Sequence, residues 1–446
     1  MIKSSIQFIN HASVFFEYQS VGILSDPWYE GDAFHKGWNL LVENNENDVL
    51  KVLEKTNYIW ISHEHPDHFS IKFFLKYAEL LKKKKILILF QETVDKRVKK
   101  FLESKKLAVR ELPVNKKINL RDDINLICIK DGFYDSGLLI EAGGEKILNL
   151  NDCEINTQKR AKEVYKMTGS VDLLLTQFSY AAWKGGKSNI KWRQDAAAKK
   201  LETLELQIEI FKPKFLIPFA SYIYFSNIKN FYLNDAANTP KKIIEEISLS
   251  NSKLIFLKPM DVFNWIYDKN QVHAAVDFWE AAFQNIHFTE KNCYEAIEIS
   301  ELKETYTKYL ERLRNANNFI LIKIIKALSP IKIFQPIVIN LDDLDRRFIL
   351  DLFSNDLHDT NLEADLCMSS ESLLFLFKNS FGFDTLTVNG CMEEGKKGGF
   401  VMSTKTLALD NLNNLGINFS IKFLVSFKLI KIFLIRLFNV SKKIND

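Results

Sequence analysis

The chain has 446 residues, of which 47% are hydrophobic and 26% charged, so it is long enough for two ordinary globular domains. A formal net charge of +4 is close to neutral for this length and argues against nucleic-acid binding as the main task. Five cysteines without a C-x-x-C pair argue against a disulfide framework, and we expect neither a signal peptide nor a spanning helix, which together predict a cytoplasmic location.

Residues 1–285 alternate short β-rich runs with helical runs, which is typical of an α/β sandwich. Ile86–Phe90 is apolar on both faces and predicts a central strand, and Gly143-Gly144 predicts a hairpin turn. The other predicted strands are Ile6–Ile9, Ser13–Tyr18, Ile23–Ser25, Tyr58–Ser62, Ile124–Ile129, Leu138–Ala142, Lys146–Leu150, Leu173–Gln177, Phe215–Pro218 and Leu254–Leu257. The predicted helices are Ile71–Leu81, Asp95–Ser104, Thr157–Tyr165, Trp192–Phe211 and Pro240–Ser248.

A dense cluster of ligand side chains lies between the strand ending at Ser62 and the helix starting at Ile71. His63 and His65 are two apart on extended backbone, so both imidazoles project to one side, while Asp67 and His68 face a second position. Imidazoles and a carboxylate are donors that suit zinc or iron. The alternative is a polar loop in which histidines happen to cluster. The full H-x-H-x-D-H spacing between a strand and a helix is more specific than two histidines alone.

This segment resembles the metal-binding signature of the metallo-β-lactamase superfamily, whose members are αββα sandwiches that hold one or two metal ions at the sheet edges. Asn10–Tyr18 is similar to the opening hairpin of the lactonase-like and phospholipase-D-like branch, and Leu24–Trp28 is similar to its Asp-Pro turn. Other segments look closest to the metallo-β-lactamase-like portion of CMP-N-acetylneuraminate hydroxylase and its bacterial relatives, namely Gly31–Trp38, Leu148–Cys153 and Ile217–Ser221. The resemblance implies fold class α/β, with an αββα metallo-β-lactamase-like sandwich over residues 1–285.

The resemblance also implies a ligand set. His63 and His65 match the pair that holds one ion, Asp67 and His68 match the pair that holds a second ion, and Asp152 lies where a bridging carboxylate belongs. A third ligand of the first ion is expected near residues 133–137, where the sequence offers only Asp135.

A final histidine is expected after Ile217–Ala220, but the sequence has no histidine between His68 and His273, and Asn227 is a weak substitute. These donors favour a single metal over a full two-zinc site. His11 and His35 lie in N-terminal turns, where each either supplies a donor, binds substrate or has a hydrogen-bonded structural role. We expect one or two divalent ions, with zinc first and iron or manganese as alternatives.

Further residues are expected around the metal. By resemblance, Asp26 lies behind the motif and orients a ligand, although an aspartate before proline is also common in turns. An aromatic, glycine-ended loop follows Gln177, and such loops at strand ends either contact substrate or simply pack. The candidate contacts to a small-molecule substrate are His35, Trp38, Tyr180, Trp183 and Lys184.

From residue 286 the pattern changes to α+β, and we predict an accessory domain over residues 286–446, of unknown role and without a dense ligand cluster. The stretch 417–440 is rich in Phe, Leu and Ile and holds four basic residues but no acidic residue. That composition permits peripheral contact with an anionic membrane. Because the charges do not fall on one helical face, a docking or core helix is the favoured alternative.

The first functional hypothesis is a metal-dependent hydrolase acting on an ester, lactone, amide or phosphodiester, with Asp67 orienting a metal-activated water or acting as base. The second follows the narrower resemblance: a hydroxylase-like protein of nucleotide-sugar or glycan-precursor metabolism. It would need a separate redox partner, because the chain lacks the Cys-His pairs of a Rieske module. The third is a degenerate member that binds ligand without turnover. The sequence does not fix the oligomeric state.

Overall fold

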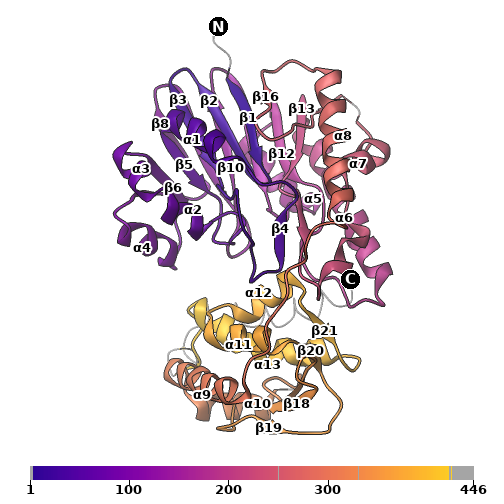
Figure 1. The fold of residues 1–446 in the computed structure, drawn as a ribbon. Helices are drawn as coiled ribbons and strands as arrows, with labels where there is room; N and C mark the ends of the chain where they lie inside the picture. The colour runs from indigo at the N-terminus through magenta and orange to yellow at the C-terminus, as the bar shows by residue number, and fades with distance from the viewer. Residues whose placement is uncertain (1–3, 250, 330, 421–422, 424–446) are drawn as a thin grey trace.

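Two mixed sheets form the centre of the N-terminal part of the computed structural model, which describes residues 4–249, 251–329, 331–420 and 423 (Figure 1). The first sheet has the order β16-β1-β2-β3-β5-β6-β7. Strands β1, β2 and β3 pair antiparallel, whereas β3, β5, β6 and β7 run parallel. The strands are β1 Ser5–Asn10, β2 Ser13–Tyr18, β3 Val21–Ser25, β5 Tyr58–Ile61, β6 Leu87–Gln91, β7 Ala108–Leu112 and β16 Val262–Phe263.

The second sheet has the order β15-β13-β12-β11-β10-β9-β8. Strands β8 to β11 form an antiparallel meander, and β11, β12, β13 and β15 then run parallel. The strands are β8 Lys117–Arg121, β9 Ile124–Lys130, β10 Ser136–Ala142, β11 Glu145–Asn151, β12 Leu173–Gln177, β13 Phe215–Phe219 and β15 Lys253–Leu254. The predicted hairpin turn at Gly143-Gly144 is confirmed, since both glycines have positive φ between β10 and β11.

Helices cover the outer faces of both sheets (Figure 1). The first group packs apolar side chains such as Leu53, Phe74 and Leu102 onto the first sheet. The second group shares a core with the inner faces of the sandwich. The helices are α1 Glu46–Lys55, α2 Ile71–Lys76, α3 Ala78–Lys83 and α4 Arg97–Ser104 on the first sheet, and α5 Gln158–Thr168, α6 Ile190–Phe211, α7 Pro240–Glu246 and α8 Lys269–Asn285 beside the second. The predicted αββα sandwich is therefore confirmed.

The C-terminal part is α+β, as predicted. Its five-stranded sheet has the order β19-β18-β17-β20-β21. Its elements are β17 Ile337–Leu341, β18 Arg346–Leu350, β19 His358–Asp359, β20 Leu366–Met368, β21 Met392–Glu394, α9 Ile299–Ala316, α10 Phe319–Leu328, α11 Ser370–Lys378, α12 Gly382–Asn389 and α13 Gly399–Asn414. No helix within the described ranges is both long and apolar enough to cross a membrane. The predicted membrane or docking segment 417–440 falls mostly outside the described residues.

The two parts share one hydrophobic cluster. Phe34, Trp38 and Trp183 from the N-terminal part belong to the same cluster as Ile337 and Leu386 from the C-terminal part. A two-stranded sheet of β4 Trp38–Leu40 and β14 Ile223–Phe225, followed by the 3₁₀ helix η1 Phe231–Ala236, lies in this contact region. The boundary between residues 285 and 286 stays a prediction, since α8 ends at Asn285 but the cores on either side are continuous.

Gly37 offers a test of this contact. A Cβ built on Gly37 would lie 2.4 Å from Cβ of Asn389 and 2.9 Å from the carbonyl oxygen of Phe34. We expect Gly37→Ala to lower the free energy of unfolding by about 1–3 kcal/mol through overpacking. Gly186→Ala is the matched control, because the nearest atom there is a movable Glu393 carboxylate oxygen at 3.2 Å. Urea unfolding of both variants gives the comparison, and equal stability would contradict the close packing.

Candidate metal centre

Five chain segments meet at one edge of the sandwich. Asp26 follows β3, the motif from His63 follows β5, and Asp152 follows β11. His11 lies in the turn between β1 and β2, and Asp135 lies between β9 and β10. The first sheet fixes the distance between Asp26 and the motif, because Asp26 N–H donates to the carbonyl oxygen of Trp60 in β5 at 3.0 Å. The carboxyl ends of neighbouring parallel strands share an edge, so side chains just beyond them converge.

Seven side chains form three overlapping donor groups, and within each group one ligand atom per residue lies within 4.8 Å of the others. His63 belongs to two of the groups and His68 to two, so the groups form one continuous centre. The groups are His63, His65 and Asp135; His63, His68 and Asp152; and His11, Asp67 and His68. All six metal ligands predicted from the sequence are brought together.

Unpaired polar atoms show that this donor set fits a cation. Oδ1 of Asp67 and Nδ1 of His11 are buried and make no hydrogen bond. Nε2 of His68 is also buried, and its neighbours are Oδ2 of Asp67 at 3.3 Å and Oδ2 of Asp152 at 3.4 Å. Leaving a buried polar atom unpaired costs about 1–3 kcal/mol, so unpaired atoms on two side chains of one donor group indicate atoms kept for a ligand. Imidazoles with carboxylates suit zinc, iron or manganese, and the geometry does not choose between them.

The protonation states of the donors differ across the centre. Burial lowers the pKa of both His63 and His65 to about 4, so both imidazoles are neutral and ready to bind a metal at neutral pH. Burial alone would raise the pKa of Asp152, but the adjacent charge of His68 brings it down to about 2. Burial would likewise lower the pKa of His68, but Asp67, Asp152 and Asp26 hold it well above its usual value. Metal binding at His68 therefore requires release of a proton.

Asp26 lies behind the motif. Its Oδ2 is 3.0 Å from Nδ1 of His68 and accepts from Ser62 Oγ at 2.8 Å and from Asn151 Nδ2 at 2.6 Å, while Oδ1 accepts from Ser62 N–H at 2.7 Å. A buried carboxylate with these partners fixes the orientation of the His68 ring. The contact is the one expected of Asp26, and its effect on metal affinity stays a prediction.

His11 adds an imidazole to the donor group of Asp67 and His68. Its Nε2 lies 3.2 Å from Oδ2 of Asp67, and its side chain is 2% exposed. Directly after β13, Ala220 N–H donates to the carbonyl oxygen of His11 at 2.8 Å. The chain after β13 thus holds the His11 turn and supplies no imidazole. The side chain of Asn227 instead donates to the carbonyl oxygen of Lys36 at 3.3 Å.

The predicted substrate contacts lie mainly where the two parts of the protein meet. Trp38, Tyr180 and Trp183 are buried, with 2%, 3% and 6% exposed. Tyr180 donates to the carbonyl oxygen of Leu233, and Lys184 is half-buried in the same loop as Trp183. These positions favour packing, and contact with substrate stays a prediction.

His35 lies in a strained turn that joins the metal centre to the C-terminal part. Phe34, His35 and Lys36 all have positive φ, which costs non-glycine residues conformational energy. The Phe34 ring lies 5.6 Å from the His65 ring, while His35 stacks on Phe375 at 4.1 Å between ring centres. The turn therefore contacts a metal donor on one side and α11 on the other.

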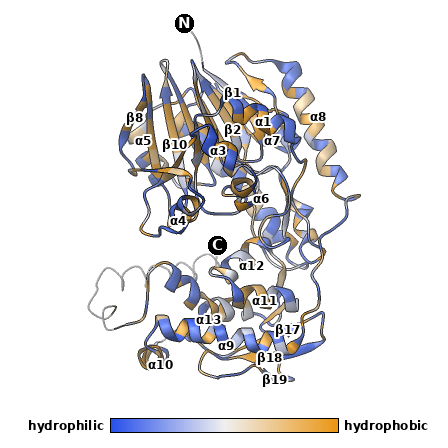
Figure 2. Cartoon of the chain, turned by 60° about the vertical axis from the view of Figure 1, so that its left-hand side comes forward, coloured by the Kyte–Doolittle hydropathy of each residue, from blue (hydrophilic) through white to orange (hydrophobic). Residues whose placement is uncertain are grey.

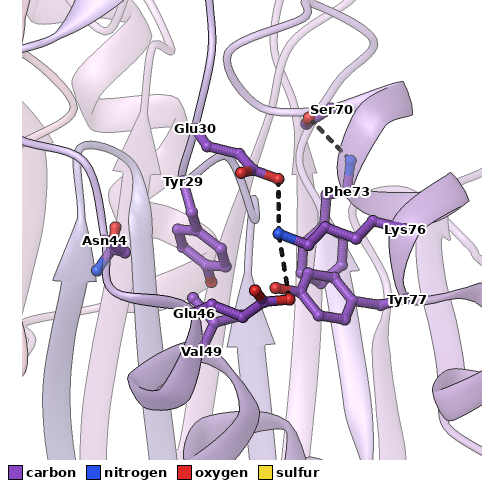
Figure 3. Close-up of a pocket in the computed structure, with 9 residues that line it drawn as sticks. All are labelled: Tyr29, Glu30, Asn44, Glu46, Val49, Ser70, Phe73, Lys76 and Tyr77. Carbon is purple, nitrogen blue, oxygen red and sulfur yellow. Dashed lines mark hydrogen bonds and ion pairs between the residues drawn. The ribbon is translucent and has the colours of Figure 1, made fainter.

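A small hollow beside α2 is lined by residues that belong to none of the donor groups named above (Figure 3). It has a volume of about 20 Å³, room for roughly one water molecule. Lys76 lies between Glu30 and Glu46, with Nζ–Oε1 distances of 3.1 and 3.2 Å. Ser70 is the N-cap of α2, and its Oγ accepts from Phe73 N–H. Its size and its satisfied charges exclude it as a substrate pocket.

Comparison with known proteins adds to this geometry. No family model matches the chain. Over 264 residues the chain is 26% identical to the cytidine monophosphate-N-acetylneuraminic acid hydroxylase of Danio rerio, covering 55% of this chain and 43% of the relative. Its sequence homologues include CMP-N-acetylneuraminic acid hydroxylases, such as that of Mus musculus at 25% identity. The chain spans less than half the length of this hydroxylase, so the hydroxylase resemblance predicted from the sequence is confirmed over that span only.

Solved structures with similarity include Igni18, a metallo hydrolase from Ignicoccus hospitalis, at 14% identity and a TM-score of 0.41, covering 60% of this chain and all of that one. The diiron β-hydroxylase CmlA from Streptomyces venezuelae is 12% identical with a TM-score of 0.37, covering 66% of this chain and 53% of that one.

Proposed function

We propose that the protein is a metal-dependent hydrolase that acts on an ester, lactone, amide or phosphodiester. The observation that supports this proposal most directly is the continuous set of seven donors. His63, His65 and Asp135 form one triad, His11, Asp67 and His68 form another, and Asp152 lies with a histidine of each. Two triads joined by a carboxylate match the requirements of a site for two divalent ions better than a single-metal site.

The chain's own residues would arrange the reaction around such ions. A bound divalent cation supplies acidity, lowering the pKa of water from about 15.7 toward about 7, and polarises the oxygen of the scissile group. Burial would raise the pKa of Asp67, but His68 and His11 hold it well below its usual value, so the carboxylate is anionic at neutral pH. Oδ1 of Asp67 has no hydrogen-bond partner, which leaves it able to accept a proton or orient a water molecule.

A hydroxylase is the second candidate, and the names of the homologues favour it. Such a reaction also needs a source of electrons. The donor groups found among the described residues contain no cysteine, and Cys128, Cys153 and Cys391 are buried as free thiols. A hydroxylase of this kind would therefore depend on a separate redox partner, and its substrate by analogy would be a nucleotide sugar.

Metal analysis combined with two activity assays discriminates between these candidates. The purified full chain would be analysed for metal, then incubated with an ester, a lactone, a phosphodiester and a CMP-sugar while oxygen uptake is followed. Hydrolysis without oxygen uptake supports the hydrolase. Oxygen uptake that depends on an added reductant supports the hydroxylase. A chain that binds no metal even after loading contradicts both and favours a binding protein.

His65→Ala tests the first donor triad. The variant loses a neutral imidazole that belongs with His63 and Asp135, so we expect metal affinity to fall by more than about tenfold, because even outer-shell losses cost that much. Activity should fall with it. His273→Ala is the control, since His273 is exposed on α8. Equilibrium dialysis with zinc measures the affinity, and unchanged binding by His65→Ala would remove His65 from the ligand set.

A further inference from the structure

One helix of the C-terminal part exposes an apolar face. On α10, Ile320 is 73% exposed, Ile324 49% and Leu328 78%, whereas Ile322 is fully buried in the cluster shared by the two parts. Positions i, i+4 and i+8 lie along one side of a helix, so the exposed three form a continuous line, here named the α10 stripe. Figure 2 shows α10 with hydrophobic colouring at the margin of the C-terminal part. Aligned exposed apolar side chains of this kind mark an interaction surface.

The sequence that contains α10 carries basic residues only, of which Arg312 is paired with Asp410. Residues 312–341 contain no aspartate or glutamate, and their basic residues are Arg312, Arg314, Lys323, Lys326 and Lys332. Lys323 and Lys332 are exposed, and Lys323 directly precedes Ile324 of the stripe. The Nζ atoms of Lys323 and Lys326 lie 5.7 and 4.7 Å from the Phe353 ring centre, so both amines are on the flank of the helix. The partner must therefore accept apolar side chains bordered by positive charge.

The chain near Phe419 contacts the first turn of this helix. Asn318, the N-cap of α10, donates its N–H to the carbonyl oxygen of Phe419 at 2.7 Å, and Phe419 N–H donates to Oδ1 of Asn317 at 2.9 Å. The chain beyond Phe419 therefore starts next to the first turn of α10. Residues 411–445 contain no acidic residue and are rich in Phe, Leu and Ile, and their basic residues are Lys422, Lys428, Lys431, Arg436, Lys442 and Lys443.

Two occupants could cover the α10 stripe, namely the C-terminal segment of this chain and an anionic surface. Electrostatics favours the anionic surface. Packing the C-terminal segment onto α10 would bring two purely basic sequences together, and like charges in partly desolvated surroundings repel. An anionic surface neutralises both sequences at once. We propose that the α10 stripe docks onto the surface of an anionic lipid bilayer, with the basic residues beside it contacting lipid headgroups. The helix lies in the interface and does not cross the bilayer, which fits its ten residues.

Vesicle sedimentation with the full chain tests this proposal. We expect the protein to sediment with vesicles of phosphatidylcholine mixed with phosphatidylserine, and to stay in solution with phosphatidylcholine alone. High salt should weaken binding, because it screens the attraction between basic side chains and headgroups. Failure to bind the phosphatidylserine vesicles at low salt would overturn the proposal. So would binding that is equal for both vesicle types.

Two full-chain variants distinguish vesicle binding through the α10 stripe from non-specific binding through other exposed apolar side chains. The triple variant Ile320→Ser, Ile324→Ser, Leu328→Ser should bind about tenfold more weakly or worse, because interfacial binding scales with buried apolar area. The charge variant Lys323→Glu, Lys332→Glu should lose binding to a similar extent and keep every apolar side chain of the stripe. The control is Ile266→Ser, Phe288→Ser, which removes apolar side chains that are 73% and 88% exposed elsewhere.

The outcome that would contradict the proposal is binding by the triple variant that equals binding by the parent protein. A second contradicting outcome is a stripe covered by the chain's own C-terminal segment. In that case the parent protein would ignore phosphatidylserine vesicles, and the triple variant would become more sensitive to protease after residue 423. Melting temperatures of all variants should stay close to the parent value, since every substituted side chain is exposed.

Discussion

Replacing Asp152 with asparagine is expected to lower metal binding below one ion per chain, with affinity reduced more than about a hundredfold. Asp152 Oδ2 lies 3.4 Å from Nε2 of His68, and the residue shares a donor group with His63 and His68. Each of those histidines also belongs to one of the outer triads. The substitution therefore removes the carboxylate that serves both halves of the centre, and an amide offers a neutral, weaker donor. Elemental analysis after metal loading and dialysis measures the result.

Asp131→Asn is the matched control for this variant. Asp131 is also a buried carboxylate close to the centre, but its Oδ1 pairs with Nε of Arg160 at 2.9 Å and it belongs to none of the donor groups found in the described ranges. We expect Asp131→Asn to keep the metal content of the parent protein. If Asp152→Asn keeps two ions while folding normally by circular dichroism, Asp152 does not join the two triads, and a two-ion centre loses its main support.

The motif was predictable because its ligands are neighbours in the sequence. Four donors from His63 to His68 lie between a strand and a helix, and that local pattern needs no tertiary information. Asp135 and Asp152 came from the family resemblance. The contact between His11 and Asp67 could not be predicted from a local pattern, because 56 positions separate the two residues in the sequence. They come into contact only because the β1–β2 turn lies at the same edge of the sheet as the loop that follows β5, with β3 between them.

The aromatic loop shows where residue type misleads. Tyr180 and Trp183 at a strand end predict a substrate surface, yet the ring centres of Trp183 and Phe400 lie 4.5 Å apart. The backbone N–H of Trp183 donates to the carbonyl oxygen of Thr387 at 3.0 Å. Aromatic side chains serve domain packing and ligand stacking equally well. The sequence could not show that α12 and α13 would cover this loop.

Fold prediction failed for two reasons that are visible in particular elements. The sequence does not predict strand β7, because this strand lies at a sheet edge, exposes polar side chains and lacks an apolar run. Gly382 begins α12, although glycine is a poor helix former. There the glycine allows a close approach, since a Cβ would lie 2.6 Å from Cα of Leu376. Helix α1 was also missed, although Asn45 as N-cap and the spacing of Val49, Val52 and Leu53 would have indicated it.

His11→Ala is expected to reduce bound metal from two ions per chain to one. The imidazole is the one donor of the second triad that comes from outside the motif, and without it the second ion keeps Asp67, His68 and the shared Asp152. The first triad of His63, His65 and Asp135 is untouched, so one ion should remain bound with the affinity of the parent protein. Titration of the parent protein and of the variant with metal, in competition with a chelating indicator, measures the binding of the first and of the second ion separately.

His287→Ala is the matched control for the imidazole, since His287 is exposed and belongs to none of the donor groups among the described residues. His11→Asn adds a second comparison. It removes the imidazole but keeps a short polar side chain in a turn with φ of 37°, a conformation that asparagine tolerates. If both His11 variants still bind two ions, the second ion does not depend on His11, and the ligand expected after β13 must be sought elsewhere. If only His11→Ala loses the ion, the turn conformation rather than the imidazole controls the second position.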